Sequence, residues 1–452
     1  MDSAGIMVLH DLMFACEMYP ATKEYLELYE LEIKQNVEKL KSHPSIVLWI
    51  GNNEVNEAWN NWGFQSGLTK ENKQLVWDWY LTLFHTLLPS LLSSHPYWPS
   101  SPLYGYGHPE SLLSGDSHFW SVWADQKPIS EYLKSGRFMS EYGMQGFPDR
   151  NTIFSFTEEK DRDVKSDVMK RHEKHLKGFE NLGIYMEELF GYVPENFNDY
   201  SYLAQVLQSF AIKTAIESHR SSPYCMGTLY WQMNDIWPGI TWSSVDYYGR
   251  YKALHYEVKN LYKDVVFVAK KHLHIDPKET KIYLINDLNH DIKGSIEIVT
   301  RNVKGERLES KRFDVTQESG TTNIIFTEKR SIPVSTATAP LFYDVRGEFV
   351  GKEGQKQEEE YGFMDGWPKE WGLIKAPKVK IHLEKGVIRV EGDVIVRYLY
   401  IFLEERYLQL DRNYFDVVPG KVSICKILNL KEIGEIKEND IKWMSLNDLL
   451  RN

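Results

Sequence analysis

The rhythm of apolar runs changes once along the chain, and this change most constrains the fold. Up to about residue 262, short apolar runs alternate with segments of helical period. That alternation predicts β-α units and a parallel sheet. From about residue 263, apolar and polar residues alternate at period two, as in KIYLINDLNHDIKGSIEIVT. This second pattern is typical of antiparallel β-sandwiches.

The first region contains six apolar runs that we predict to be strands, with helices between them. The predicted strands cover residues 6–9, 46–50, 97–101, 115–118, 137–140 and 227–231. Two predicted helices show apolar stripes, formed by Leu28, Leu31, Val37 and Leu40 and by Leu203, Val206, Phe210 and Ile216. In the second region, residues 355–378 resemble a linker between two sandwich modules. The length of 452 residues fits two or three domains.

Polar or aromatic side chains follow every predicted strand. In a parallel barrel, the carboxyl ends of the strands meet at one mouth, where the chemistry takes place. The residues at these ends are Asp11, Asn52, Asn53, Glu54, Ser100, Ser101, Asp116, His118, Trp120, Ser140, Glu141, Tyr142, Trp231, Gln232, Asn234 and Asp235. Glu54 and Glu141 form the kind of carboxylate pair that glycoside hydrolysis requires. The alternative interpretation is two surface glutamates that cap helices.

Charge and cysteine content narrow the function classes. The formal net charge is -11, and no Lys/Arg run is long enough for a nucleic-acid patch, which disfavours nucleic acid and anionic membranes as partners. No segment reaches the roughly 18 apolar residues needed to span a bilayer. The N-terminal segment does not read as a signal peptide, and the chain contains no N-glycosylation sequon. The three cysteines, Cys16, Cys225 and Cys425, lack metal-ligand spacing, and we expect buried free thiols.

Four motifs carry a resemblance to a known family. HPSIVLWIGNNE, SGDSHFW, RFMSEYGMQGFPD and GTLYWQMNDIWPGITWSSVDYYGRYKALHY occur in this order, and they closely resemble β-mannosidases of glycoside hydrolase family 2. The resemblance extends over residues 5–256 and is weaker in the sandwich region. It implies a retaining exo-acting enzyme that releases terminal non-reducing β-D-mannose from oligosaccharide or glycoprotein glycans, with no metal or other cofactor.

The resemblance also implies roles for individual residues. Glu54, in Asn-Asn-Glu, corresponds to the acid/base, and Glu141, in Ser-Glu-Tyr-Gly, corresponds to the nucleophile. Asn53 corresponds to the residue that binds the sugar 2-hydroxyl. Trp62 and Trp231 correspond to aromatic residues of the terminal-sugar subsite. Trp120 is a further match, and Asp116 and His118 are expected to contact substrate or support the site.

The chain departs from the family at its N-terminal side. The family has a (β/α)8 TIM barrel, and the first strand predicted here aligns with the third strand of that barrel. We therefore expect a partial TIM barrel without its first two strands at residues 1–262, followed by immunoglobulin-like β-sandwich modules at 263–372 and 373–452. Activity of this chain alone is in question. Animal members are lysosomal, which gives the expected compartment if the source is an animal.

Other interpretations remain open at this point. Asp116 and His118 could be metal ligands, although a metal site normally needs three or more. Arg137 could orient Glu141 or be a structural charge, and Asp235 could bind sugar or cap a loop. Another family-2 activity, β-galactosidase or β-glucuronidase, is the alternative enzyme. An inactive sugar-binding remnant is the alternative outside enzymes. The natural aglycone and the oligomeric state cannot be inferred from the sequence.

Overall fold

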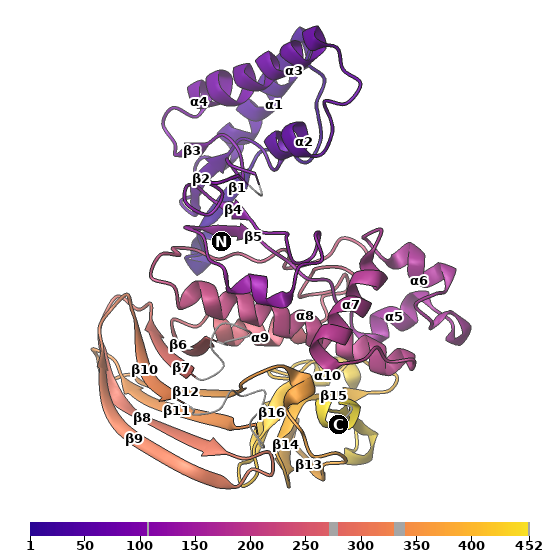
Figure 1. Cartoon of the computed structure of the whole chain (residues 1–452), viewed down its shortest axis with the longest axis vertical. Helices are drawn as coiled ribbons and strands as arrows, with labels where there is room; N and C mark the ends of the chain where they lie inside the picture. Colours follow the sequence, from indigo (N-terminus) through magenta and orange to yellow (C-terminus); the bar gives the residue numbers. More distant parts are fainter. Residues whose placement is uncertain (106–107, 271–278, 330–339, 451–452) are drawn as a thin grey trace. The chain divides into compact units, whose positions relative to one another are not determined.

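The computed structural model of the chain describes residues 1–105, 108–270, 279–329 and 340–450, and these form two compact units (Figure 1). Unit 1 consists of Met1–Trp120, Ser135–Tyr142 and Tyr224–Leu229. Unit 2 consists of Ser121–Lys134, Gly143–Pro223 and Tyr230–Asn452. Across the described ranges, none of the helices combines the length and apolarity that a membrane crossing demands.

The strands of unit 1 are short and parallel. They are β1 (Val8–Asp11), β2 (Ile46–Ile50), β3 (Tyr97–Trp98), β4 (Ser117–His118) and β5 (Met139–Glu141). Strands β1, β2 and β3 pair in that order, and β4 pairs with β5. A parallel bridge from Met139 to Thr228 continues the second group. Neighbouring strands therefore follow chain order, which is the arrangement found in the wall of a β/α barrel.

The predicted strand at 46–50 coincides with β2, and the other predicted strands of this region are shifted or shortened. The sixth predicted strand, at 227–231, was wrong, because within this segment only Thr228 forms a β-bridge. The main chain of Gly227 and Leu229 pairs with Met139 at 2.9 and 2.8 Å. Beyond that point the chain belongs to unit 2, where Gln232 accepts from Ser244 instead.

Helix α1 (Lys23–Leu40) shows which apolar stripe packs in unit 1. Its buried residues are Tyr29, Ile33 and Val37, which are spaced four apart and join the core of this unit. The predicted stripe was partly wrong, since Leu28 and Leu31 are more than half exposed. The other helical segments of unit 1 are η1 (Asp2–Ala4), α2 (Val55–Asn61), α3 (Lys70–Thr82), η2 (Leu83–Leu87) and α4 (Leu88–Leu91).

Helix α8 (Phe197–Arg220) is the central helix of unit 2. Every residue from Tyr200 to His219 is buried, so the predicted stripe is confirmed within a helix that is covered on all sides. The remaining helical segments of unit 2 are η3 (Ile129–Leu133), α5 (Arg150–Phe156), η4 (Glu159–Asp161), α6 (Asp167–His172), α7 (Gly178–Phe190), α9 (Ala253–Leu261), η6 (Pro368–Glu370), α10 (Leu430–Ile433), η7 (Glu438–Asp440) and α11 (Leu446–Leu449).

Two antiparallel sandwiches complete unit 2 (Figure 1). In the first, the sheets β10-β7-β6 and β12-β11-β8-β9 share one apolar core. In the second, the sheets β13-β14-β17 and β16-β15-β18 share another. The strands are β6 (Val265–Lys270), β7 (Glu279–Asn286), β8 (Ile292–Arg301), β9 (Arg307–Gln317), β10 (Thr321–Lys329), β11 (Phe342–Val350), β12 (Lys356–Met364), β13 (Val379–Glu384), β14 (Val387–Gly392), β15 (Val396–Leu403), β16 (Phe415–Val417), β17 (Ser423–Lys426) and β18 (Ile441–Met444).

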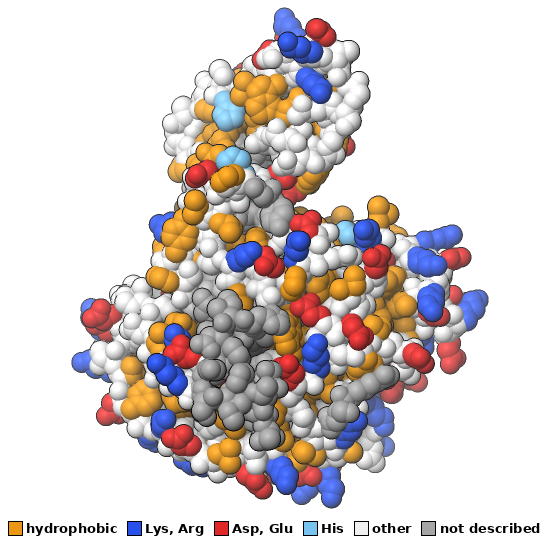
Figure 2. All heavy atoms as spheres, viewed as in Figure 1, with side chains coloured by type: hydrophobic (Ala, Val, Ile, Leu, Met, Phe, Trp, Pro, Cys, Tyr) orange, Lys and Arg blue, Asp and Glu red, His pale blue; other side chains and the backbone are white. Residues whose placement is uncertain are grey.

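The period-two alternation is thus confirmed as a signal for sandwich strands. The predicted linker at 355–378 is wrong in its first part, because Lys356–Met364 forms β12 and pairs with β11 along its whole length. Strand β12 contains three consecutive glutamates, which interrupt the apolar alternation in the sequence, although Phe363 in the same strand is buried. Figure 2 shows basic and acidic side chains interspersed over the visible face, with neither sign forming a continuous field.

Candidate active site

The ends of the parallel strands in unit 1 bring a polar cluster together. Asn53 forms parallel bridges with Ala15 on one side and with Ser101 on the other. The next residue, Glu54, donates its backbone N–H to the carbonyl of Ser101 at 2.9 Å. Pairing between neighbouring chain segments therefore extends beyond the strands and fixes the backbone that carries Glu54.

Glu54 has a left-handed backbone, with φ 59° and ψ 13°. A non-glycine residue in this conformation costs roughly 1–3 kcal/mol, and such residues gather at functional sites. Its buried neighbour Asn52 accepts from the N–H of Val55 at 3.0 Å and from the hydroxyl of Ser100 at 3.1 Å. Asn52 thereby holds the turn that leads from β2 into α2, and the side chain of Glu54 is presented at the strand end.

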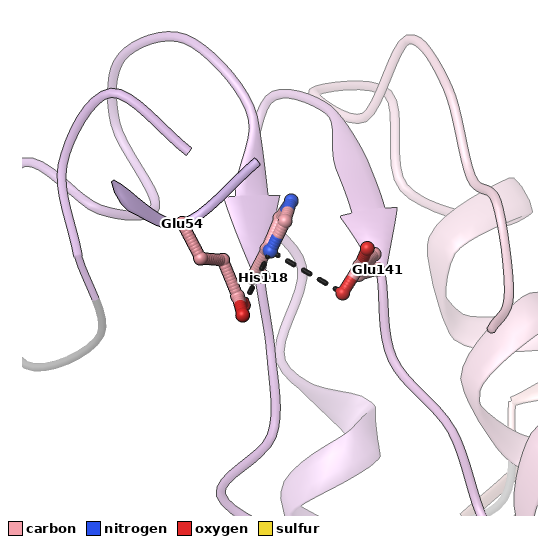
Figure 3. A group of neighbouring side chains, drawn as sticks. All are labelled: Glu54, His118 and Glu141. Atoms are coloured by element: carbon pink, nitrogen blue, oxygen red, sulfur yellow. Dashed lines mark hydrogen bonds and ion pairs between the residues drawn. The ribbon is translucent and has the colours of Figure 1, made fainter. Parts of the chain in front are cut away.

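His118 lies between the two glutamates predicted to form a pair (Figure 3). Its Nδ1 is 2.7 Å from Oε1 of Glu54 and 3.3 Å from Oε2 of Glu141. One ligand-type atom from each of the three side chains lies within 4.8 Å of the others. The two carboxylates are therefore close neighbours, and both contact one ring nitrogen.

A chain of hydroxyl groups fixes the other side of His118. Asp116 Oδ2 accepts from Ser101 at 2.5 Å and from Ser140 at 2.7 Å. The single hydroxyl proton of Ser101 is used in this bond, so its oxygen accepts from Nε2 of His118 at 2.9 Å. Nε2 therefore carries a proton. Nδ1 faces two carboxylate oxygens, and a proton on it satisfies both contacts, so the ring is an imidazolium.

The electrostatics agree with this assignment. Burial lowers the pKa of His118, but the carboxylates of Glu141 and Glu54 outweigh burial and raise the pKa to about 9. Burial raises the pKa of Glu141 to about 7, although the positive charge of His118 opposes that shift. Trp120 Nε1 donates to Glu141 Oε2 at 3.2 Å and stabilises the ionised form. The cluster thus contains a cation and a carboxylate that titrates near neutral pH.

The same three side chains are close enough together to surround a metal ion, since Glu54, His118 and Glu141 bring ligand-type atoms within 4.8 Å. Nitrogen and carboxylate oxygen are donors that zinc accepts. A protonated His118 has no free lone pair, however, so a metal would first have to displace the Nδ1 proton. Ser101 lies between Asp116 and His118. The geometry suits an imidazolium hydrogen-bonded to two carboxylates better than it suits a metal ion.

Several other predicted residues join this cluster, and some do not. Asp116, His118 and Trp120 are within it, as described. Asn53 lies at its edge, with Nδ2 donating to Cys16 Sγ at 3.4 Å. Trp62 ends helix α2 and is 46% exposed. Trp231 belongs to unit 2. The sugar-binding roles of these residues stay predictions.

The structure gives the partners of two charged residues whose roles the sequence left open. Arg137 does not contact Glu141. Its guanidinium donates to the carbonyl of Tyr224 at 3.0 Å and stacks over the ring of that residue. Asp235 accepts from the hydroxyls of Thr241 and Ser243 at 2.5 and 2.7 Å, so it holds a loop in unit 2.

Sequence reasoning missed one residue of the cluster. Cys16 was expected to be buried, but it is exposed, and its Sγ lies 3.5 Å from Oε2 of Glu54. The expectation was wrong because Cys16 follows β1 in a left-handed conformation, with φ 52°, which turns the residue towards Asn53 and Glu54. Cys425 is buried as predicted, and Cys225 is half-buried. A signal was available, since Cys16 lies five residues after the end of β1, on the strand-end side of the unit.

Known proteins match nearly the whole chain. Beta-mannosidase B from Thermothelomyces thermophilus is 29% identical over 93% of this chain and 53% of its own. Beta-mannosidase from Bos taurus is 33% identical over 61% of this chain and 35% of its own. The crystal structure of beta-D-mannosidase from Dictyoglomus thermophilum covers 98% of this chain and 53% of its own, with 30% identity and a TM-score of 0.79. No protein-family model matches the chain.

The chain spans about half the length of the curated relatives it matches. The sequence match to the Thermothelomyces thermophilus enzyme covers 93% of this chain, and the structural match to the Dictyoglomus thermophilum enzyme covers 98%. The parallel strands of unit 1 and the sandwiches of unit 2 therefore both have counterparts in these relatives.

Proposed function

We propose that the chain is a β-mannosidase of glycoside hydrolase family 2, as its similarity to the beta-mannosidases above supports, and that it hydrolyses terminal non-reducing β-D-mannosides with retention of configuration. One observation carries the proposal. The carboxylates of Glu54 and Glu141 approach within 4.8 Å, oxygen to oxygen. Retaining glycosidases hold their two carboxyl groups about 5–5.5 Å apart, whereas inverting enzymes need about 6.5–9.5 Å to admit water.

In the proposed first step, Glu141 attacks the anomeric carbon while Glu54 donates a proton to the glycosidic oxygen. The bond from carbon to the aglycone oxygen breaks, and a mannosyl ester forms on Glu141. In the second step Glu54 removes a proton from water, the resulting hydroxide attacks the anomeric carbon, and Glu141 leaves as a carboxylate. Asn53, Trp62 and Trp120 would bind the sugar, as the family resemblance implies, and Asp116 would contact the sugar or support the site; the same role for Trp231, which belongs to unit 2, stays a prediction.

The test is hydrolysis of 4-nitrophenyl β-D-mannoside by the 452-residue chain, with the β-galactoside and β-glucuronide as matched controls. We expect the β-mannoside to be the preferred substrate and β-mannose to be the first product in proton NMR. A fluorinated mannosyl fluoride should become covalently attached to Glu141, as measured by peptide mass spectrometry. Preference for another sugar, a first product of inverted configuration, or no turnover at all would each reject the proposal.

A pH dependence follows from the raised pKa of Glu141. The nucleophile must be ionised, so protonation of Glu141 below its pKa of about 7 removes activity. We expect kcat/KM to fall tenfold per pH unit below an apparent pKa near 7, rather than near the ordinary glutamate value of about 4.3. A pH profile of kcat/KM for 4-nitrophenyl β-D-mannoside measures this. A plateau that continues down to pH 5 would contradict it.

We further propose that β1 to β5, together with the bridged segment at Thr228, correspond to the third to eighth strands of a (β/α)8 barrel spanning 1–262, and that the sandwich modules span 263–372 and 373–452. The chain-order parallel pairing supports the barrel. If the first strand has a partner on one side only, amides of β1 (Val8–Asp11) should exchange with solvent faster than those of β2. Equal protection of β1 and β2 in hydrogen exchange would contradict this.

A lysosomal compartment is proposed if the source is an animal.

A further inference from the structure

We propose that His118 acts as a positioning residue that neutralises Glu141 in the first step and Glu54 in the second, rather than as a substrate contact. The inference rests on the proposed function, and it starts from the position of Nδ1. This nitrogen lies 2.7 Å from Glu54 Oε1 and 3.3 Å from Glu141 Oε2. One N–H is therefore within hydrogen-bond reach of both carboxylates (Figure 3).

The reaction moves one negative charge between those two carboxylates. In the form that enters the first step, Glu54 carries the proton that it donates and Glu141 is an anion. Proton donation leaves Glu54 as an anion, and bond formation converts Glu141 into a neutral ester. The second step reverses both changes. At each stage a single negative charge therefore needs a cation, and the carboxylate that bears the charge alternates.

The surroundings of His118 fit this alternating role. The ring is buried, with a side chain 3% exposed, so an unpaired carboxylate beside it would be costly. On the far side Nε2 donates to Ser101, and Asp116 Oδ2 lies 3.8 Å away. Ser101 and Ser140 both donate to this Asp116 oxygen. These contacts keep the second ring nitrogen protonated throughout, and only Nδ1 exchanges partners.

The position of the ring also argues against a substrate contact. Both ring nitrogens are engaged by protein groups, Nδ1 by the two glutamates and Nε2 by Ser101. An imidazolium has two donors and no acceptor. A sugar hydroxyl could gain a bond to His118 only by displacing one of these protein partners.

The experiment compares His118→Asn with the unaltered chain in each half-reaction separately. The amide nitrogen of asparagine occupies the position of Nδ1 and can donate to either glutamate, but it carries no charge. The first step is measured as kcat/KM for 4-nitrophenyl β-D-mannoside. The second is measured as recovery of activity after trapping with 2-deoxy-2-fluoro-β-mannosyl fluoride. We expect both rates to fall roughly 10²- to 10³-fold, and the acid limb of the pH profile to move to higher pH.

The outcomes separate this inference from the proposed function. If the unaltered chain neither turns over nor traps the fluorosugar, the proposed function itself fails. If the unaltered chain is active and His118→Asn slows only the first step, His118 does not serve Glu54 in the second step and the inference is wrong. Unchanged rates in both steps would also reject it.

A second measurement does not depend on the variant folding. In the unaltered chain labelled with 15N-histidine, both ring nitrogens of His118 should show the chemical shifts of a protonated ring. The same shifts should persist in the trapped glycosyl-enzyme, because the cation now faces Glu54. Loss of the Nδ1 proton on trapping would overturn the inference.

Discussion

Replacement of Glu141 by alanine should lower kcat/KM for 4-nitrophenyl β-D-mannoside by roughly 10⁴- to 10⁶-fold. The carboxylate is the only group proposed to form a bond to the anomeric carbon, and alanine leaves a space where an external nucleophile can bind. Added azide should therefore restore turnover and yield α-mannosyl azide, of inverted configuration. Rates and the configuration of the azide product are measured by absorbance and by proton NMR.

Ser140→Ala is a suitable control for this variant. Ser140 precedes Glu141 on β5 and donates to Asp116, so this variant disturbs the strand and the hydroxyl network behind His118 but keeps both glutamates. A small loss in Ser140→Ala beside a large loss in Glu141→Ala would show that the effect comes from the carboxylate and not from disturbance of the strand. Near-normal hydrolysis by Glu141→Ala would show that another group is the nucleophile.

Replacement of Glu54 by alanine should produce a loss that depends on the leaving group. For an alkyl β-mannoside, whose departing alkoxide needs a proton, kcat/KM should fall about 10²- to 10⁴-fold. For 2,4-dinitrophenyl β-mannoside, whose phenolate leaves unaided, kcat/KM should change little. Azide should here react with the intermediate on Glu141 and give β-mannosyl azide, so the two glutamate variants yield products of opposite configuration.

Glu57→Ala provides the matched control. Glu57 is a partly buried carboxylate three residues after Glu54, on helix α2, and it accepts from Asn61 at 2.9 Å. Any loss in Glu57→Ala should be the same for both leaving groups. An equal loss for both leaving groups in Glu54→Ala would mean that Glu54 supports the structure of the site and does not donate the proton.

The carboxylate cluster was predictable because it depends on backbone periodicity. A parallel strand is recognisable as an apolar run, and its carboxyl end is the residue where that run stops. Glu54 follows from this rule, and so does Glu141 after Phe138 and Met139, whereas Asp116 and His118 lie in Gly-Asp-Ser-His, which contains no apolar side chain. The sequence could not predict that His118 contacts both glutamates, because that requires the rotamers of three side chains. The catalytic roles themselves rest on resemblance and stay proposals until the variants are measured.

The errors have local causes. In α1, helical period alone allows either Leu28 and Leu31 or Tyr29 and Ile33 to face the core. The second set is buried because Tyr29 packs edge-on against Phe14 and Trp79, contacts between residues distant in sequence. For Arg137 the sequence left two roles open, to orient Glu141 or to be a structural charge. Its observed partner is Tyr224, which lies 87 residues along the chain.

The contact between Cys16 and Glu54 bears on the chemical durability of the protein. Thiols are oxidised and alkylated as thiolates. Partial burial and the carboxylate of Glu54, 3.5 Å from the sulfur, raise the pKa of Cys16 to about 12. An exposed cysteine is normally a point of attack for peroxide or for electrophilic drugs. Here partial burial and the neighbouring carboxylate of Glu54 favour the protonated thiol, so we expect Cys16 to react slowly with peroxide and with alkylating agents.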